Sequence, residues 1–433
     1  MAIFNSGNNS LQTHNKTLFE VVMVADQFGN PITSGNPSGM AVDGFGRARM
    51  STPFTLFDSF NRFKINNDFV SSNTATGNVG FDTNQSSVTL NIDTTSGAKV
   101  IRETKKVFAY QPGKSLQILN TFVLNTPIAN LRQRVGYFGS QNGIYFENDG
   151  TGNYFVKRSY SSGSMVETRV AQADWNTDKL DGEGTSKITF DPTKAQIFFT
   201  DIEWLGVGSV RCGFVIDGRL IHCHSFHHAN LIDYAYMTTA CLPIRYEIEN
   251  TGTTSSNSTL KQICSTVITE GGYELSGEVH TYGLEPTGAS QFNLATAGTY
   301  YPVLSFRLHP NRLDAIVLPV DIDIVPINNG FYKVKLVRNC TLNGATWANT
   351  SATSPVQYQS NTSATHTGGE NLYSSYLTAT TQASSAFNIG RELFKYQLER
   401  DGLTNTAYDF TVLITCGTNS SNVIATVTWQ EIT

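Results

Sequence analysis

Residues 212–223 read Cys-Gly-Phe-Val-Ile-Asp-Gly-Arg-Leu-Ile-His-Cys and place Asp217-Gly218 between two runs of strand-forming residues. Asp-Gly tolerates the positive φ that a two-residue hairpin turn requires, and β-branched and aromatic residues favour extended backbone. The segment therefore predicts a β-hairpin. It also indicates the fold class, because short alternating runs separated by turn residues recur along most of the chain.

Further strands are expected on both sides of this hairpin. Alternating runs cover residues 87–92, 106–110 and 116–124, and Asn142-Gly143 and Asp149-Gly150 supply more turn signals. After residue 300 the runs resume, at 301–308, 315–325, 331–337 and 410–415. We expect an all-β chain: a jelly-roll or lectin-like β-sandwich core over residues 51–280, followed by a second, smaller β-sandwich over residues 281–433.

Two segments lack this pattern. Residues 1–50 are polar and glycine-rich and predict an extended N-terminal arm, which either grips a neighbouring molecule or is a flexible terminus. Residues 341–385 are mostly Ser, Thr, Asn, Ala and Gly, and they predict a Ser/Thr-rich insertion of exposed contact loops.

Composition argues against several classes of partner. Charged residues make up only 15% of the chain and the formal net charge is −5, with no basic stripe suited to nucleic acid. No apolar run reaches the roughly 18 residues that cross a bilayer. The six cysteines lie far apart without a CxxC pair, so we expect reduced, buried thiols and no zinc ribbon.

Motifs for catalysis are missing from the sequence. It contains no GxSxG elbow, and Pro112-Gly-Lys-Ser115 fails as a phosphate loop because Phe108 occupies the position of the required first glycine. Six acidic residues lie close together in the chain, and roles as turn and strand-end residues suit them better than paired catalysis: Asp178, Asp181, Glu183, Asp191, Asp201 and Glu203. We expect neither catalytic residues nor a cofactor.

The densest group of candidate metal ligands is His222-Cys-His224-Ser-Phe-His227-His228. Imidazole is the commonest metal ligand, and His222 and His224 share one face of a strand. A zinc or iron site also needs ligands from a second element, which the sequence does not identify. We therefore expect a strand edge with hydrogen-bonded histidines and no metal, with His222, His224, His227 and His228 as the candidates for a site.

Four aromatic residues are candidates for contacts with glycans. Trp175, Trp204, Tyr234 and Tyr236 lie in the second half of the core region, and aromatic faces bind sugar rings. The alternative is that these side chains fill the sandwich core or an interface.

The central region resembles a group of uncharacterised virion structural proteins of large tailed bacteriophages, of the kind seen in marine and cyanobacterial phages. The resemblance covers about residues 46–275. It is carried by long runs in a fixed order, among them Gly46-Arg-Ala-Arg-Met-Ser-Thr-Pro-Phe-Thr-Leu-Phe-Asp58, Tyr110-Gln-Pro-Gly-Lys-Ser115, Asn142-Gly-Ile-Tyr-Phe-Glu147, Asp201-Ile-Glu-Trp-Leu-Gly-Val-Gly208 and Leu242-Pro-Ile-Arg-Tyr-Glu-Ile248.

The resemblance implies a structural protein associated with the capsid, neck or tail of a virion and assembled in the host cytoplasm. We expect a homo-oligomer that contacts other phage structural proteins through its β-domains and arm. The alternative is a glycan-binding adhesin on the particle exterior. An enzyme is not expected.

Overall fold

The computed structural model describes residues 53–74, 76–272, 277–287, 291–379 and 396–432, and the backbone alone of 13–14, 17–18 and 385–388. The chain divides into two compact units, Met1–Thr52 and Pro53–Thr433. The predicted N-terminal arm lies outside the described residues apart from two short paired strands, β1 (Thr13–His14) and β2 (Thr17–Leu18). Residues 380–384 of the predicted insertion also lie outside them.

The expected all-β fold is confirmed. Strands form almost all of the described regular structure, and every strand pair is antiparallel. A single turn of 3₁₀ helix, η1, spans Gln172–Asp174. Among the described residues, no helix has the length and apolar character to span a membrane.

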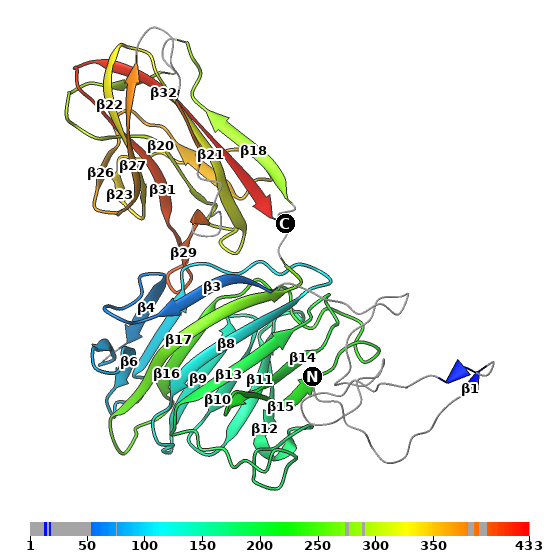
Figure 1. Cartoon of the computed structure of the whole chain (residues 1–433). Helices are drawn as coiled ribbons and strands as arrows, with labels where there is room; N and C mark the ends of the chain where they lie inside the picture. The colour runs from blue at the N-terminus through cyan, green and yellow to red at the C-terminus, as the bar shows by residue number, and fades with distance from the viewer. Residues whose placement is uncertain are drawn as a thin grey trace. The chain divides into compact units, whose positions relative to one another are not determined.

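The first sandwich contains two large sheets (Figure 1). The seven-stranded sheet has the order β12 (Val166–Ala171), β11 (Asn153–Ser159), β10 (Gly143–Asn148), β9 (Leu131–Phe138), β16 (Ile244–Asn250), β7 (Lys99–Thr104) and β4 (Phe69–Thr74). The eight-stranded sheet has the order β15 (Arg219–Phe226), β14 (Val210–Ile216), β13 (Gln196–Ile202), β8 (Ser115–Val123), β17 (Ser258–Glu270), β6 (Ser87–Ile92) and β5 (Asn78–Asp82), and β3 (Phe54–Phe60) also pairs with β17.

Alternation of side chains between the two faces explains the core between these sheets. In β8 every second residue is buried, as expected for a strand with one face on a core. Phe146 lies at the centre of an aromatic cluster, with its ring 5.3 Å from that of Phe214 and 5.6 Å from that of Phe190. This dense aromatic packing accounts for much of the apolar area that the first sandwich buries.

The hairpin predicted around Asp217-Gly218 is confirmed. Ile216 pairs with Arg219, which leaves Asp217 and Gly218 as the two turn residues, with φ angles of 52° and 72°. Positive φ at both positions is the geometry of the tight turn that matches the twist of paired strands. A bulge interrupts the register at Cys223, because Cys212 faces His224 and Gly213 faces His222.

The second sandwich also contains two sheets. The five-stranded sheet has the order β18 (Glu278–Gly283), β32 (Ser421–Ile432), β21 (Ile316–Pro326) and β28 (Ser385–Asn388), with β19 (Phe292–Leu294) also paired to β32. The six-stranded sheet has the order β24 (Ala348–Asn349), β25 (Val356–Gln359), β20 (Tyr301–Leu308), β31 (Asp409–Cys416), β22 (Gly330–Arg338) and β27 (Glu370–Ala379). The second sandwich also contains two short strand pairs: β23 (Thr341–Asn343) with β26 (Thr365–Thr367), and β29 (Arg400–Asp401) with β30 (Thr406–Ala407).

The described residues of the Ser/Thr-rich segment 341–385 are mostly exposed, and they form strands where loops were expected. The segment contributes β23 to β27, and β27 pairs with β22 along its whole length, from Arg338 opposite Glu370 to Gly330 opposite Ala379. Leu372 and Leu377 pack against the core of the second sandwich. Few apolar anchors are enough here, because backbone pairing holds this strand in the sheet.

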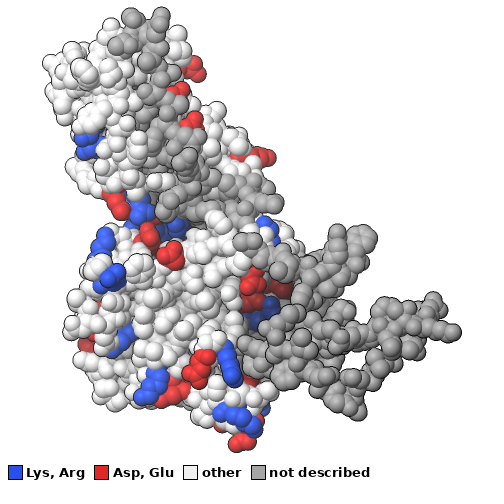
Figure 2. Space-filling model, in the orientation of Figure 1, with Lys and Arg blue, Asp and Glu red and all other residues white. Residues whose placement is uncertain are grey.

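The two sandwiches contact each other within the unit Pro53–Thr433. Val107 and Ala109, which follow β7, form an apolar cluster with Ile316 and Leu318 of β21. The backbone N–H of Arg400 donates to the Lys105 carbonyl at 2.8 Å. Figure 2 shows a largely uncharged face on which acidic and basic side chains gather between the two sandwiches.

Candidate functional site

The histidine-rich segment at the end of β15 is divided among separate hydrogen-bonded environments. His222 Nε2 lies 2.9 Å from Ser225 Oγ. His224 Nδ1 accepts a hydrogen bond from the Asn176 backbone N–H at 3.4 Å, and its ring packs edge-on against Phe226. The bulge at Cys223 disrupts the simple alternation on which a shared face for His222 and His224 depends.

The other two histidines lie in different surroundings. His227 is exposed and has Nδ1 3.1 Å from Ser209 Oγ. His228 is buried, with its ring stacked on Tyr236 at 3.8 Å. His228 Nδ1 donates to the Gly208 carbonyl at 2.6 Å, and Nε2 lies 3.0 Å from the Lys157 ammonium.

Burial governs the charge state of these rings. Burial, with a smaller contribution from neighbouring positive charge, lowers the pKa of His224 and of His228 to about 4. Within the residues that the structure describes, no group of three or more His, Cys, Asp or Glu side chains is placed to hold a metal ion. The segment therefore acts as neutral, hydrogen-bonded packing at the sandwich edge.

The four aromatic candidates for glycan contacts do not form one surface. Trp175 is 2% exposed and stacks on Phe155 at 4.1 Å, and Tyr236 lies under His228. Trp204 is half-buried and donates from Nε1 to the Met237 carbonyl, whereas Tyr234 is exposed. This corrects the expectation for Trp175 and Tyr236, because a ring enclosed by the core offers no face to a sugar.

The acidic residues between positions 178 and 203 have local structural roles. Asp178 accepts from the backbone N–H groups of Leu180 and Ser186, at 2.9 and 2.7 Å. Asp191 accepts from the N–H of Thr193 at 2.9 Å. Such side-chain to backbone bonds fix turns.

A charged network covers the outer face of the seven-stranded sheet, and its residues are not among the site candidates predicted from the sequence. Arg134 of β9 stands opposite Glu147 of β10 on one side and Glu247 of β16 on the other. Its guanidinium lies 3.4 Å from Glu147, 3.3 Å from Glu247 and 3.1 Å from Glu249. The strand register therefore places a buried arginine among three carboxylates.

Further residues extend this network in both directions. Arg245 contacts Glu247 at 2.9 Å and Glu103 at 3.5 Å, and Arg169 contacts Glu147 at 2.6 Å. Burial raises the pKa of Glu247, but the charges of Arg134, Arg245 and Lys99 outweigh burial and hold that pKa at about 2. For Glu103 burial outweighs Arg245 and Arg400, so its pKa is raised.

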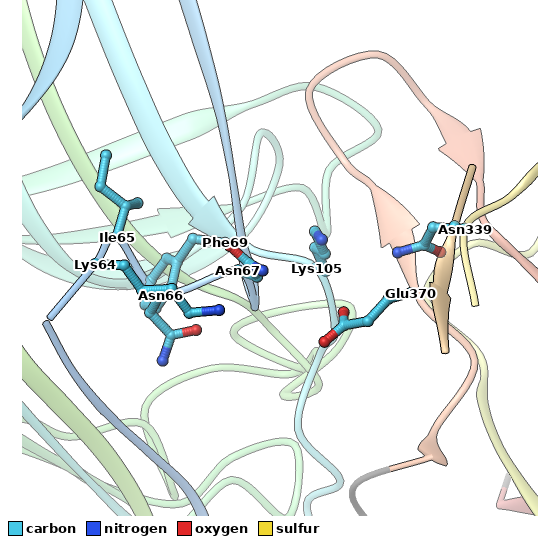
Figure 3. Close-up of a pocket in the computed structure, with 9 residues that line it drawn as sticks. Lys64, Ile65, Asn66, Asn67, Phe69, Lys105, Asn339 and Glu370 are labelled. Atoms are coloured by element: carbon cyan, nitrogen blue, oxygen red, sulfur yellow. The ribbon is translucent and has the colours of Figure 1, made fainter. Parts of the chain in front are cut away.

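A pocket of about 560 Å³ lies where the two sandwiches meet (Figure 3). The first sandwich contributes the segment before β4, with Lys64, Ile65, Asn66, Asn67 and Phe69, and also Lys105 from the loop after β7. The second sandwich contributes Asn339, Gly369 and Glu370. The lining combines amide and charged groups with a small apolar surface.

Arg338 fixes the wall of this pocket. Its guanidinium lies 3.2 Å from Asp68 of the first sandwich and 2.9 Å from Glu370 of the second, and it also pairs with the buried Glu399. Buried charges paired in this way hold side chains in fixed positions. The pocket is thus built on an ion-paired junction of two sheets.

No family model and no curated protein matches the chain. Among solved structures, it is similar to a Bacillus licheniformis β-glucanase, with 11% identity, a TM-score of 0.33, and coverage of 49% of this chain and 96% of the other. It is also similar to arcelin-5, a lectin-like defence protein of Phaseolus vulgaris, with 8% identity, a TM-score of 0.31, and coverage of 51% and 99%.

A third similar structure is the CBM2 module of an evolved Dit protein of Lactobacillus casei BL23 phage J-1, with 6% identity, a TM-score of 0.33, and coverage of 52% and 99%. At these identities and TM-scores the neighbours carry no conclusion about activity or ligand.

Proposed function

We propose that this chain is a structural protein of a tailed-phage particle, associated with the capsid, neck or tail and assembled in the host cytoplasm. The resemblance over residues 46–275 supports the phage context. A role in assembly is supported by two strongly exposed aromatic side chains, Phe60 and Phe63, which are 60% and 79% exposed. The proposal includes no catalytic activity.

These aromatic side chains lie at the end of an edge strand. Among the described strands, β3 pairs with β17 alone and lies at an edge of its sheet. Such an edge is a template for a neighbouring chain, and large exposed aromatic side chains are typical of contact surfaces. Further copies of this chain and other phage structural proteins are the partners that this surface fits.

Purified particles provide the direct test of this role. Mass spectrometry is expected to detect the chain in them, and a reconstruction is expected to place it in a symmetric position. In solution, sedimentation of the full chain is expected to show an oligomer that the double substitution Phe60→Ser, Phe63→Ser weakens. Phe331→Ser, at an exposed site of the second sandwich, is the matched control.

A chain that is monomeric in solution and missing from particles would overturn this proposal. Weakened association in the Phe331→Ser control, with the β3 variant unchanged, would move the contact to the second sandwich. Thermal unfolding of each variant separates lost association from lost folding.

A second function, glycan binding on the particle exterior, is favoured by the pocket of Figure 3. Sugars present hydroxyl groups to amide and charged side chains and apolar C–H faces to hydrophobic ones. The pocket combines both, because Asn66, Asn67 and Asn339 line it together with Ile65 and Phe69. A glycan array probed with the full chain tests this function, and failure of every glycan to bind would remove it.

A further inference from the structure

We infer that the pocket lined by Lys64, Lys105 and Glu370 binds an acidic saccharide, a sugar that carries a carboxylate. The inference rests on the second function proposed above and specifies both its site and its class of ligand. It is drawn from the distribution of charge in the pocket, from the positions of the two lysines and from the pocket's size.

The carboxylates beside the pocket share the Arg338 guanidinium. Glu370 accepts from Arg338 Nε at 3.0 Å, and the same guanidinium pairs with Asp68 and Glu399. Glu370 keeps a carboxylate oxygen able to accept hydrogen bonds from hydroxyl groups.

Lys64 and Lys105 differ from Arg338, which is paired with carboxylates. Among the described residues, neither Lys64 nor Lys105 has a carboxylate within ion-pair distance. Lys105 Nζ lies 5.5 Å from the centroid of the Tyr408 ring, and its charge acts on Glu399 from beyond ion-pair distance. Two ammonium groups that line one open pocket attract an anion, and a carboxylate accepts charge-assisted hydrogen bonds from an ammonium group.

Figure 3 shows Lys105 between two groups of polar side chains, with Asn66 and Asn67 on one side and Asn339 and Glu370 on the other. A ligand bound by Lys105 would thus have amide groups on both sides and the Glu370 carboxylate on one. These side chains can form hydrogen bonds with a sugar ring that has several hydroxyl groups. A simple anion would contact the lysines alone.

The volume of the pocket and its apolar residues also suit a saccharide. The volume of about 560 Å³ falls within the roughly 300–1,000 Å³ of typical small-molecule pockets. Phe69 is buried at the floor, with the Arg102 guanidinium 4.7 Å from its ring. Ile65, which is half-buried in the same lining, provides the apolar surface for the C–H face of a sugar ring.

Isothermal titration of the full chain tests the inference. The probes are short oligosaccharides that contain galacturonate or sialate, their neutral counterparts of matched length, and an Asp/Glu-rich peptide as a different source of carboxylates. At least one acidic saccharide is expected to bind, and to bind more weakly when ionic strength rises from about 0.05 M to about 0.5 M.

Substitution of Lys64 and Lys105 tests whether the saccharide binds in this pocket. Lys64→Gln and Lys105→Gln are each expected to weaken binding about tenfold, since each removes one charge-assisted hydrogen bond. Lys64→Arg and Lys105→Arg should retain most of the affinity. Lys179→Gln, at an exposed lysine of the first sandwich, should leave it unchanged. An unaltered thermal unfolding midpoint shows that each variant is folded.

The outcomes separate this inference from the function on which it rests. Binding of neutral glycans alone, or acidic-glycan binding that is insensitive to both lysine variants, leaves glycan binding in place and overturns this site. Binding of the acidic peptide without any saccharide overturns the ligand class. No binding of any probe overturns the inference, and a blank glycan array in addition overturns the glycan function.

Discussion

Arg134 and Glu247 form the centre of the buried network on the seven-stranded sheet. The side chain of Glu247 is 1% exposed and lies near the positive charges of Arg134, Arg245 and Lys99. Removal of one member of a buried ion-pair group leaves charge uncompensated, which is strongly destabilising. Single residues of this face therefore carry an unusual share of the stability of the first sandwich.

We expect Glu247→Gln to lower the free energy of unfolding by about 3 kcal/mol, because Arg134 and Arg245 lose their shared partner. Urea denaturation followed by tryptophan fluorescence measures the change. Glu183→Gln, at an exposed turn, is the control and should alter the free energy by less than about 0.5 kcal/mol. Equal effects of the two substitutions would contradict a structural role for the network.

The buried histidines predict a pH dependence. His224 and His228 have folded-state pKa values of about 4, below the ordinary 6.5, so between these values the unfolded chain binds more protons than the folded chain. Their contribution is fully present above pH 6.5 and is lost as the pH falls towards 4. We expect roughly 1–2 kcal/mol from each, after allowance for solvent screening.

Denaturation at several pH values between 4 and 7 measures this contribution. His224→Gln and His228→Gln should each make the profile shallower in that window. His227→Gln, at the exposed neighbour, should keep the slope of the unsubstituted chain. An identical slope in all three variants would show that these rings do not control acid stability.

At the scale of elements, the tight hairpin between β14 and β15 depends on its turn residues. Gly218 has a φ of 72°, and a Cβ added there would meet no other atom within 4 Å. Gly218→Ala should therefore lower stability by about 1 kcal/mol through backbone strain alone. Asp217→Asn should be nearly neutral because Asn tolerates the same conformation. Thermal unfolding of both variants measures the difference, and equal midpoints would contradict the turn assignment.

Some strands could be predicted from the sequence pattern more readily than others. The hairpin at Asp217-Gly218 has strong local signals and forms as predicted. Strand β27 has few apolar residues, and its pairing with β22 is non-local, so composition alone suggested a loop. Strand β16 alternates Ile244, Tyr246 and Ile248 with charged residues, a visible signal for a charged outer face whose partners come from β9 and β7.

At the scale of the whole unit Pro53–Thr433, the contact between the two sandwiches includes few but specific interactions. Arg400 of β29 pairs with Glu103 at 3.2 Å and with Asp314 at 3.0 Å. Gln397 donates to the Val107 carbonyl at 3.0 Å. Loss of the Arg400 guanidinium leaves the buried Glu103 with one fewer cation.

Arg400→Met is expected to lower the cooperativity between the sandwiches. Calorimetry should then resolve two unfolding transitions, or one broadened transition, and limited proteolysis should cleave the chain faster. Lys194→Met, at an exposed loop position, is the control and should keep the original profile. A single sharp transition in both variants would show that the sandwiches are coupled through other contacts.

The sequence by itself determined the all-β class and the central hairpin, because alternation and turn chemistry act over a few neighbouring residues. Only the tertiary structure decided the sites. It separated His222, His224, His227 and His228 into different environments, enclosed Trp175 and Tyr236, and brought Lys64 and Lys105 to a pocket with Glu370. These outcomes depend on strand order and register between residues up to about 300 positions apart, which local sequence patterns do not encode.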